Sequence, residues 1–145
     1  MRISVTIAAM CLFFITSVII AEDAVQANAA VVPSSSALKV ERSVVASSVV
    51  NREPAGVSDK FSKDLNEIFY FTHITGAADS VRIEHRWYYK GNRVQTTILH
   101  VRSPSWRTFS KRSLLRSVES AGEWKVQAVE QATGRVLSYE RFTIE

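Results

Sequence analysis

The sequence predicts an immunoglobulin-like antiparallel β-sandwich of about seven strands, preceded by an N-terminal export or anchor helix. From residue 38 onward, short segments rich in β-branched and aromatic residues alternate with turn-forming residues. No long stretch of this region has the 3.6-residue period of an amphipathic helix. An open β-barrel is the second possible architecture.

Residues 1–29 have the pattern of a signal peptide or signal anchor. Arg2 precedes residues 3–21, which carry no charge, and small-residue cleavage patterns end at Ala21 and Ala29. We expect cleavage, although the uncharged run also reaches the roughly 18 residues that can span a bilayer and tether the protein. In both cases the rest of the chain is expected in the periplasm or on the outer face of the inner membrane of a bacterium.

Residues 30–37 are small, uncharged and partly Pro and Ser, so they are predicted to form a linker to a β-sandwich domain over 38–145. The only cysteine, Cys11, lies in the apolar run, and Met10 before it argues against a lipoprotein. The domain therefore has no disulfide and must be stabilised by its own core.

The expected strands are short runs bounded by Gly, Pro, Asn or Asp. They are residues 38–50, 67–73, 80–90, 93–101, 106–110, 122–130 and 136–144. Residues 51–60 contain Pro54 and Gly56 and are predicted to be a loop. In the last strand, Leu137 differs in parity from Phe142, which predicts a bulge near Glu140 or Arg141.

The clearest alternation is in residues 80–90, where Ile83, His85 and Trp87 share one face. Gly91-Asn92 is predicted as a two-residue hairpin turn of type II′. Trp87 and Trp124 lie in phase with aliphatic residues and are expected in the core.

Four motifs resemble a bacterial family known as domain-of-unknown-function family 2914. They are NREP (51–54), HRWYYKGNRV (85–94), WRTFSKRSL (106–114) and GEWKVQAVEQATGRVLSYERFTI (122–144). The resemblance runs from Val40 onward, covers essentially the whole mature domain and keeps the order and spacing of the motifs. It implies an exported or membrane-tethered domain with no established activity.

No catalytic or metal-binding pattern is found in the sequence. His73, His85 and His100 fall on three separate expected strands, so structural roles are expected for them and no zinc site. There is no Gly-x-Ser-x-Gly elbow, no thiol in the domain and no identifiable pair of converging carboxylates. We expect no cofactor and no enzymatic activity, and a hydrolase is the least favoured function.

The strongest functional signal is a basic segment without acidic residues between Glu84 and Glu119. It holds eight cations: Arg86, Lys90, Arg93, Arg102, Arg107, Lys111, Arg112 and Arg116. Such a field of one sign is typical of a surface that meets an anionic partner. The alternative is a solvated face whose counterions come from elsewhere in the fold.

The residues expected to contact a partner are Trp106, Lys111, Arg112, Arg116 and Arg102. Trp106 could equally be a core residue, because its neighbours of the same parity are small or polar. We expect Arg107 to be buried instead, in a structural hydrogen-bond network with Glu53 and its neighbour Arg52.

These observations favour a non-catalytic envelope module that binds an anionic partner. An anionic glycan, a lipid head group and an acidic envelope protein are the candidate partners, and nucleic acid is not expected because the chain is exported. The alternative is a structural or assembly domain that pairs with another envelope protein through an edge strand or an apolar lip.

Overall fold

A computed structural model of the chain describes residues 37–115 and 121–145. The expected export segment 1–29, nearly all of the linker 30–37, and Arg116 lie outside the described residues. Within residues 37–115 and 121–145, no helix is long and apolar enough to cross a bilayer.

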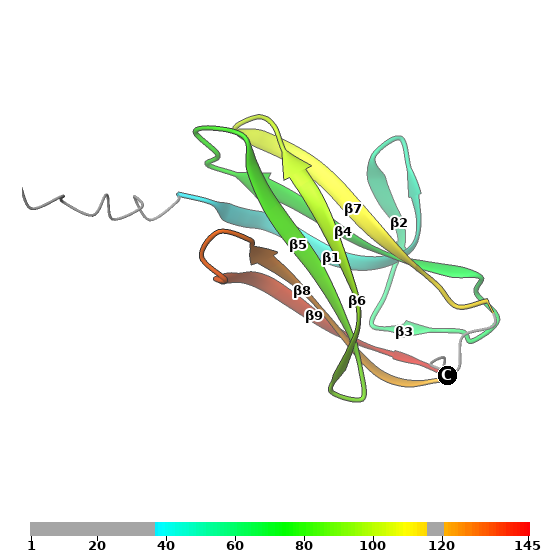
Figure 1. Cartoon of the computed structure of the whole chain (residues 1–145). Coiled ribbons are helices and arrows are strands. Elements are labelled where there is room, and N and C mark those ends of the chain that lie inside the picture. The colour runs from blue at the N-terminus through cyan, green and yellow to red at the C-terminus, as the bar shows by residue number, and fades with distance from the viewer. Residues whose placement is uncertain (1–36, 116–120) are drawn as a thin grey trace, which may run out of the picture. The chain divides into compact units, whose positions relative to one another are not determined.

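The described residues form nine strands. They are β1 (Lys39–Val50), β2 (Glu53–Val57), β3 (Lys60–Phe61), β4 (Glu67–Thr75), β5 (Val81–Tyr89), β6 (Asn92–Val101), β7 (Ser105–Ser113), β8 (Gly122–Glu130) and β9 (Val136–Ile144). One sheet has the order β2-β1-β4-β7 and the other the order β3-β9-β8-β5-β6. They pack as the two layers of an open sandwich (Figure 1), as the alternation of apolar residues predicted.

The strand count exceeds the predicted seven because the predicted loop 51–60 is partly extended. Asn51 and Arg52 both have positive φ (50° and 64°), which folds the chain back tightly, so that Val50 pairs with Glu53. Pro54, which suggested a loop, lies on the edge strand β2, where its missing N–H is tolerated. The loop prediction for residues 51–60 was therefore wrong over β2.

The hairpin between β5 and β6 and the bulge of β9 also differ from expectation. Lys90 and Gly91 form the two-residue turn, both with positive φ (46° and 84°), as in type I′ rather than type II′. The register of β8 and β9 shifts between Ala128 and Val129, which places the bulge at Leu137 and not near Glu140 or Arg141.

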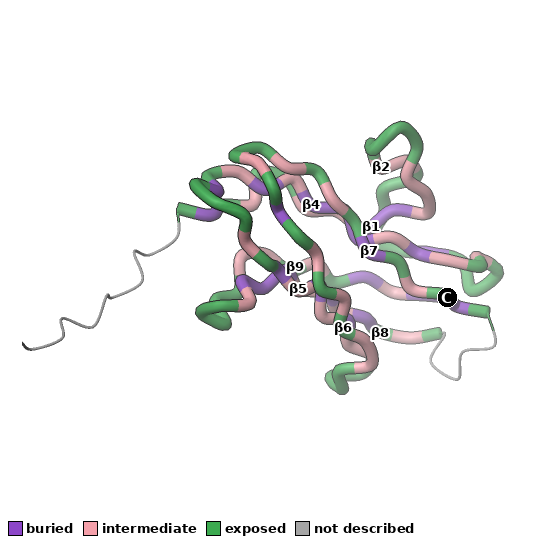
Figure 2. Tube along the Cα trace, turned by 45° about the horizontal axis from the view of Figure 1, so that its top comes forward, coloured by how far each residue is buried: buried purple, intermediate pink, exposed green. Residues whose placement is uncertain are grey.

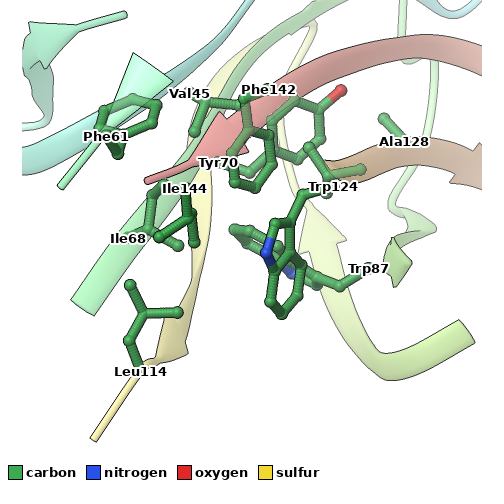
Figure 3. Close-up of a cluster of buried hydrophobic side chains, with 11 residues drawn as sticks. Val45, Phe61, Ile68, Tyr70, Trp87, Leu114, Trp124, Ala128, Phe142 and Ile144 are labelled. Carbon is green, nitrogen blue, oxygen red and sulfur yellow. The ribbon is translucent and has the colours of Figure 1, made fainter. Parts of the chain in front are cut away.

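Two clusters of buried apolar residues fill the space between the sheets. The larger one contains both predicted tryptophans, Trp87 and Trp124, and the ring of Trp124 stacks on Phe142 at a centroid distance of 6.0 Å (Figure 3). The second cluster, around Ile74 and Ile83, fills the other part of the sandwich. Along most strands, buried positions alternate with more accessible ones (Figure 2), whereas the central strand β4 has no exposed residue.

A polar network crosses this core. His85 is fully buried, and its ring nitrogens lie 2.9 Å from Ser110 Oγ and 3.2 Å from Thr72 Oγ1. Trp87 Nε1 donates to the same Ser110 oxygen at 3.1 Å. The network joins β4, β5 and β7 across the two sheets, and it gives His85 the structural role that the sequence predicted.

Candidate functional site

The strand β7 carries most of the residues that the sequence singled out, and its alternation divides them between two faces. Ser110 is buried, while Arg107 and Lys111 are exposed. Trp106 and Arg112 share the inward face with Ser110 and are half-buried. The strand β7 is thus longer in both directions than the predicted strand 106–110. Its odd-numbered residues point to solvent and its even-numbered residues point inward.

Arg107 was expected in a buried network and instead lies at the surface. Its Nε is 3.3 Å from Glu53 Oε1, so the predicted partner is correct, but both side chains are about half exposed (54% and 49%). Arg42 reaches the other oxygen of Glu53 at 3.4 Å. The prediction of burial failed because β7 turns its odd-numbered residues outward, and Arg52 makes no ion pair with any described residue.

Arg112 was expected to face water and instead turns toward the core. Its guanidinium lies over the ring of Trp124 at 5.8 Å, and Nη1 donates to Gln95 Oε1 at 3.2 Å. Lys111 is exposed as expected, and its Nζ pairs with Glu67 Oε1 at 2.6 Å. Three cations of the basic segment therefore have acidic partners. Arg107 and Lys111 pair with Glu53 and Glu67 from other strands, as the alternative prediction of a solvated face expected, and Arg86 pairs with Glu84 of its own strand.

A shallow groove of about 380 Å³ lies beside the edge strands of the two sheets, β6 and β7. We call it the β6–β7 groove. Its lining residues are Arg52, Ile98, Leu99, His100, Arg102, Trp106, Arg107, Thr108 and Phe109. None of them is acidic. The groove brings together Arg52, Arg102, Trp106 and Arg107 from three separate segments, whereas Lys111 and Arg112 do not line it.

The backbone that carries each cation of the groove is ordered by local contacts. Arg52 belongs to the tight turn between β1 and β2, and Arg107 is fixed by its ion pair with Glu53. Arg102 belongs to the short connection from β6 to β7, where Ser103 Oγ donates to the Ser105 carbonyl at 2.7 Å. The positions of the three residues along the chain are therefore set by separate local contacts.

The apolar part of the groove combines a packed and an exposed wall. Trp106 packs against the second core cluster, which fixes its ring. Ile98 and Phe109 stay 49% and 39% exposed at the rim. The sequence did not single out Ile98, His100 or Phe109 as partner-binding residues, because β6 and β7 belong to different sheets and only the packing of the sheets brings these edges together.

At the other end of the two strands the sheet edges are bridged. Gln95 Nε2 donates to the main-chain carbonyl of Lys111 at 3.0 Å, while Gln95 Oε1 accepts from Arg112. The groove lies at the opposite end of the two strands, beside Arg102 and Trp106.

Burial keeps the hydroxyl and imidazole of the core network from any substrate. Ser110 is 4% exposed and His85 0%. Burial also lowers the pKa of His85 to about 3, so the ring is neutral at ordinary pH. In residues 37–115 and 121–145, no three His, Cys, Asp or Glu side chains form a group that could hold a metal ion.

A family model described as "Protein of unknown function (DUF2914)" matches residues 80–144. The match runs from β5 to β9 and includes the motifs at 85–94, 106–114 and 122–144. The NREP stretch at 51–54 precedes the matched range. No curated protein matches the chain.

Proposed function

We propose that this chain, which belongs to the DUF2914 family through residues 80–144, is an exported non-catalytic module that binds an anionic partner in the bacterial envelope. The observation that carries the proposal is the β6–β7 groove, which Arg52, Arg102, Trp106 and Arg107 line with no acidic residue among them. Of these cations, Arg107 pairs with Glu53, while Arg52 and Arg102 form no ion pair with a described residue. An anionic glycan, a lipid head group or an acidic protein has the charge that fits it.

Export, and a place in the periplasm or on the outer face of the inner membrane, are part of the same proposal. They rest on the uncharged run 3–21 behind Arg2 and on the small residues that follow it. In that compartment, the anionic groups that a basic groove can bind are the phosphates and carboxylates of lipids, glycans and proteins.

The finer assignment of the fold as immunoglobulin-like also belongs to the proposal. The strands β1, β4 and β7 form one layer and β9, β8, β5 and β6 the other, with connections that cross between layers. Such crossing connections are the Greek-key feature of immunoglobulin-like sandwiches, and Trp87 is buried at mid-strand on β5, as in many of those domains.

The test is retention of the purified protein on immobilised heparin, a sulfated polymer, at increasing salt. The double variant Arg52→Gln, Arg102→Gln removes two groove charges that have no ion-pair partner among the described residues. We expect it to elute at clearly lower salt than the wild type. Lys39→Gln with Lys63→Gln removes two exposed charges outside the groove and is the matched control.

Elution of the groove variant at the same salt concentration as the wild type would contradict the proposal.

A second candidate, the assembly domain, is favoured by the exposed Ile98 and Phe109 at the rim. In that case a partner from envelope extract would stay bound at high salt and would be lost with Phe109→Ser, whereas an anionic partner would be released.

A further inference from the structure

A row of four side chains crosses the outer face of the five-stranded sheet. Arg141 on β9 lies opposite Lys125 on β8, Lys125 opposite Tyr88 on β5, and Tyr88 opposite Arg93 on β6. We call these residues the cross-strand row. Their sequence neighbours Trp124, Trp87 and Phe142 are buried, so the row itself points to solvent.

The row is electrostatically unfavourable in the protein alone. Like charges directly opposite each other on paired strands are destabilising, and Lys125 and Arg141 are such a pair. Neither of them, nor Arg93, forms an ion pair with another described residue. By contrast, Arg86 in the next row is neutralised by Glu84 at 2.7 Å. A bound anion would remove the repulsion.

Tyrosines lie between the cations. Lys125 Nζ is 4.4 Å from the centre of the Tyr88 ring, and the Arg141 guanidinium is 5.9 Å from that of Tyr139. Tyr139 is 56% exposed, in the neighbouring row. These contacts hold the cations over aromatic surfaces, and the exposed Tyr139 ring offers flat apolar area beside the charges.

The row borders a hollow of about 430 Å³. Four cations line it, namely Lys60, Lys90, Lys125 and Arg141, against two carboxylates, Asp59 and Glu123. These six side chains form no ion pair with one another, and the hollow keeps an excess of positive charge. Its volume is in the range of small-molecule sites, roughly 300–1,000 Å³.

We propose that the cross-strand row and its hollow are a second binding site, for a linear acidic polysaccharide that lies across the strands. Neighbouring strands are spaced at about 4.8 Å, so the row sets two adjacent cations, a tyrosine and a third cation along one line. A linear polymer with carboxylates complements such a line of cations, and its sugar rings can lie against the exposed ring of Tyr139. The row and its hollow share no residue with the lining of the β6–β7 groove, and the existence of this site does not depend on the proposed function of that groove.

The probe is polygalacturonate, a carboxylated linear polysaccharide, titrated calorimetrically into the purified protein at low salt. Lys125→Gln with Arg141→Gln is expected to weaken binding about ten-fold, the effect of losing roughly 1.4 kcal/mol. Lys39→Gln with Lys63→Gln is expected to bind like the wild type. Fully methyl-esterified polymer, which has lost the charge, is expected to bind poorly to every variant.

The double variant Lys125→Gln, Arg141→Gln has a second readout. Since it removes the repulsion between Lys125 and Arg141, its melting temperature without polymer should equal or exceed that of the wild type. If it fails to fold, Arg93→Gln at the exposed end of the row replaces it and should weaken binding in the same direction.

Unchanged affinity in the row variants would overturn this site. So would equal binding of the esterified polymer, or binding of phosphatidylglycerol vesicles alone. Loss of polygalacturonate binding only in Arg52→Gln with Arg102→Gln would place that ligand in the β6–β7 groove; it would support the proposed function and reject the second site.

Discussion

His85 is a basic residue that the fold keeps uncharged. Burial lowers its pKa to about 3, whereas in the unfolded chain it titrates near 6.5. Between these values only the unfolded state takes up the proton, so stability is complete above pH 6.5 and falls as the pH drops toward 3. The contribution of His85 to this loss is up to about 1.4 kcal/mol per pH unit.

Replacement of His85 by Gln should therefore alter the pH dependence of stability. Urea unfolding at pH 7 and pH 4.5 should show the wild type losing more free energy of unfolding than His85→Gln over that interval. His100→Gln, an exposed position on β6, is the control and should behave like the wild type. Parallel losses in wild type and His85→Gln would show that the imidazole is protonated in the folded core.

Within the strand β7, the neighbouring cations Lys111 and Arg112 point to opposite faces and differ in their contribution to stability. Arg112→Ala removes a guanidinium held over Trp124 and a hydrogen bond to Gln95, and it should cost about 1–2 kcal/mol. Lys111→Ala removes an exposed ion pair and should cost less than about 0.5 kcal/mol.

Urea midpoints measured by far-UV circular dichroism compare the two variants directly. Each one deletes a single positive charge from the same strand, so the effect of net charge cancels between them. Equal midpoints would mean that Arg112 does not contribute to the core.

The two core clusters are linked by strands that they share. The strands β4, β5 and β9 contribute side chains to both clusters. A chain shortened to residues 33–145 should therefore unfold in one cooperative transition, with coincident tryptophan fluorescence and circular dichroism curves. It contains no cysteine, so a reducing agent should not shift the midpoint. Two separated transitions would show that the clusters unfold independently.

Local patterns in the sequence predicted much of this molecule, and pairing between distant strands supplied the rest. The alternation in residues 80–90 correctly placed His85 and Trp87 in the core, because the period of two depends only on neighbours. The predicted orientations of Arg107 and Arg112 were wrong because β7 is mostly polar. Its sequence therefore does not show which alternate positions point toward the core.

The sites depended even more on contacts between distant residues. Arg102, Trp106 and Arg107 were predicted as notable residues, yet His100 and Phe109 join them only because two sheet edges meet. Likewise, Lys125 and Arg141 form a row only through the register of β8 and β9, which the bulge at Leu137 helps to set.

The hydrogen bonds of Gln95 have a consequence for self-association. A free sheet edge is a template on which strands of other molecules can add, and β7 is such an edge. Gln95 already occupies the carbonyl of Lys111, which weakens that end of β7 as a template. Two copies meeting edge to edge would have to pair at the other end, where Arg102 and Arg107 of each would repel those of its neighbour. The glutamine and the arginines together oppose aggregation along β7.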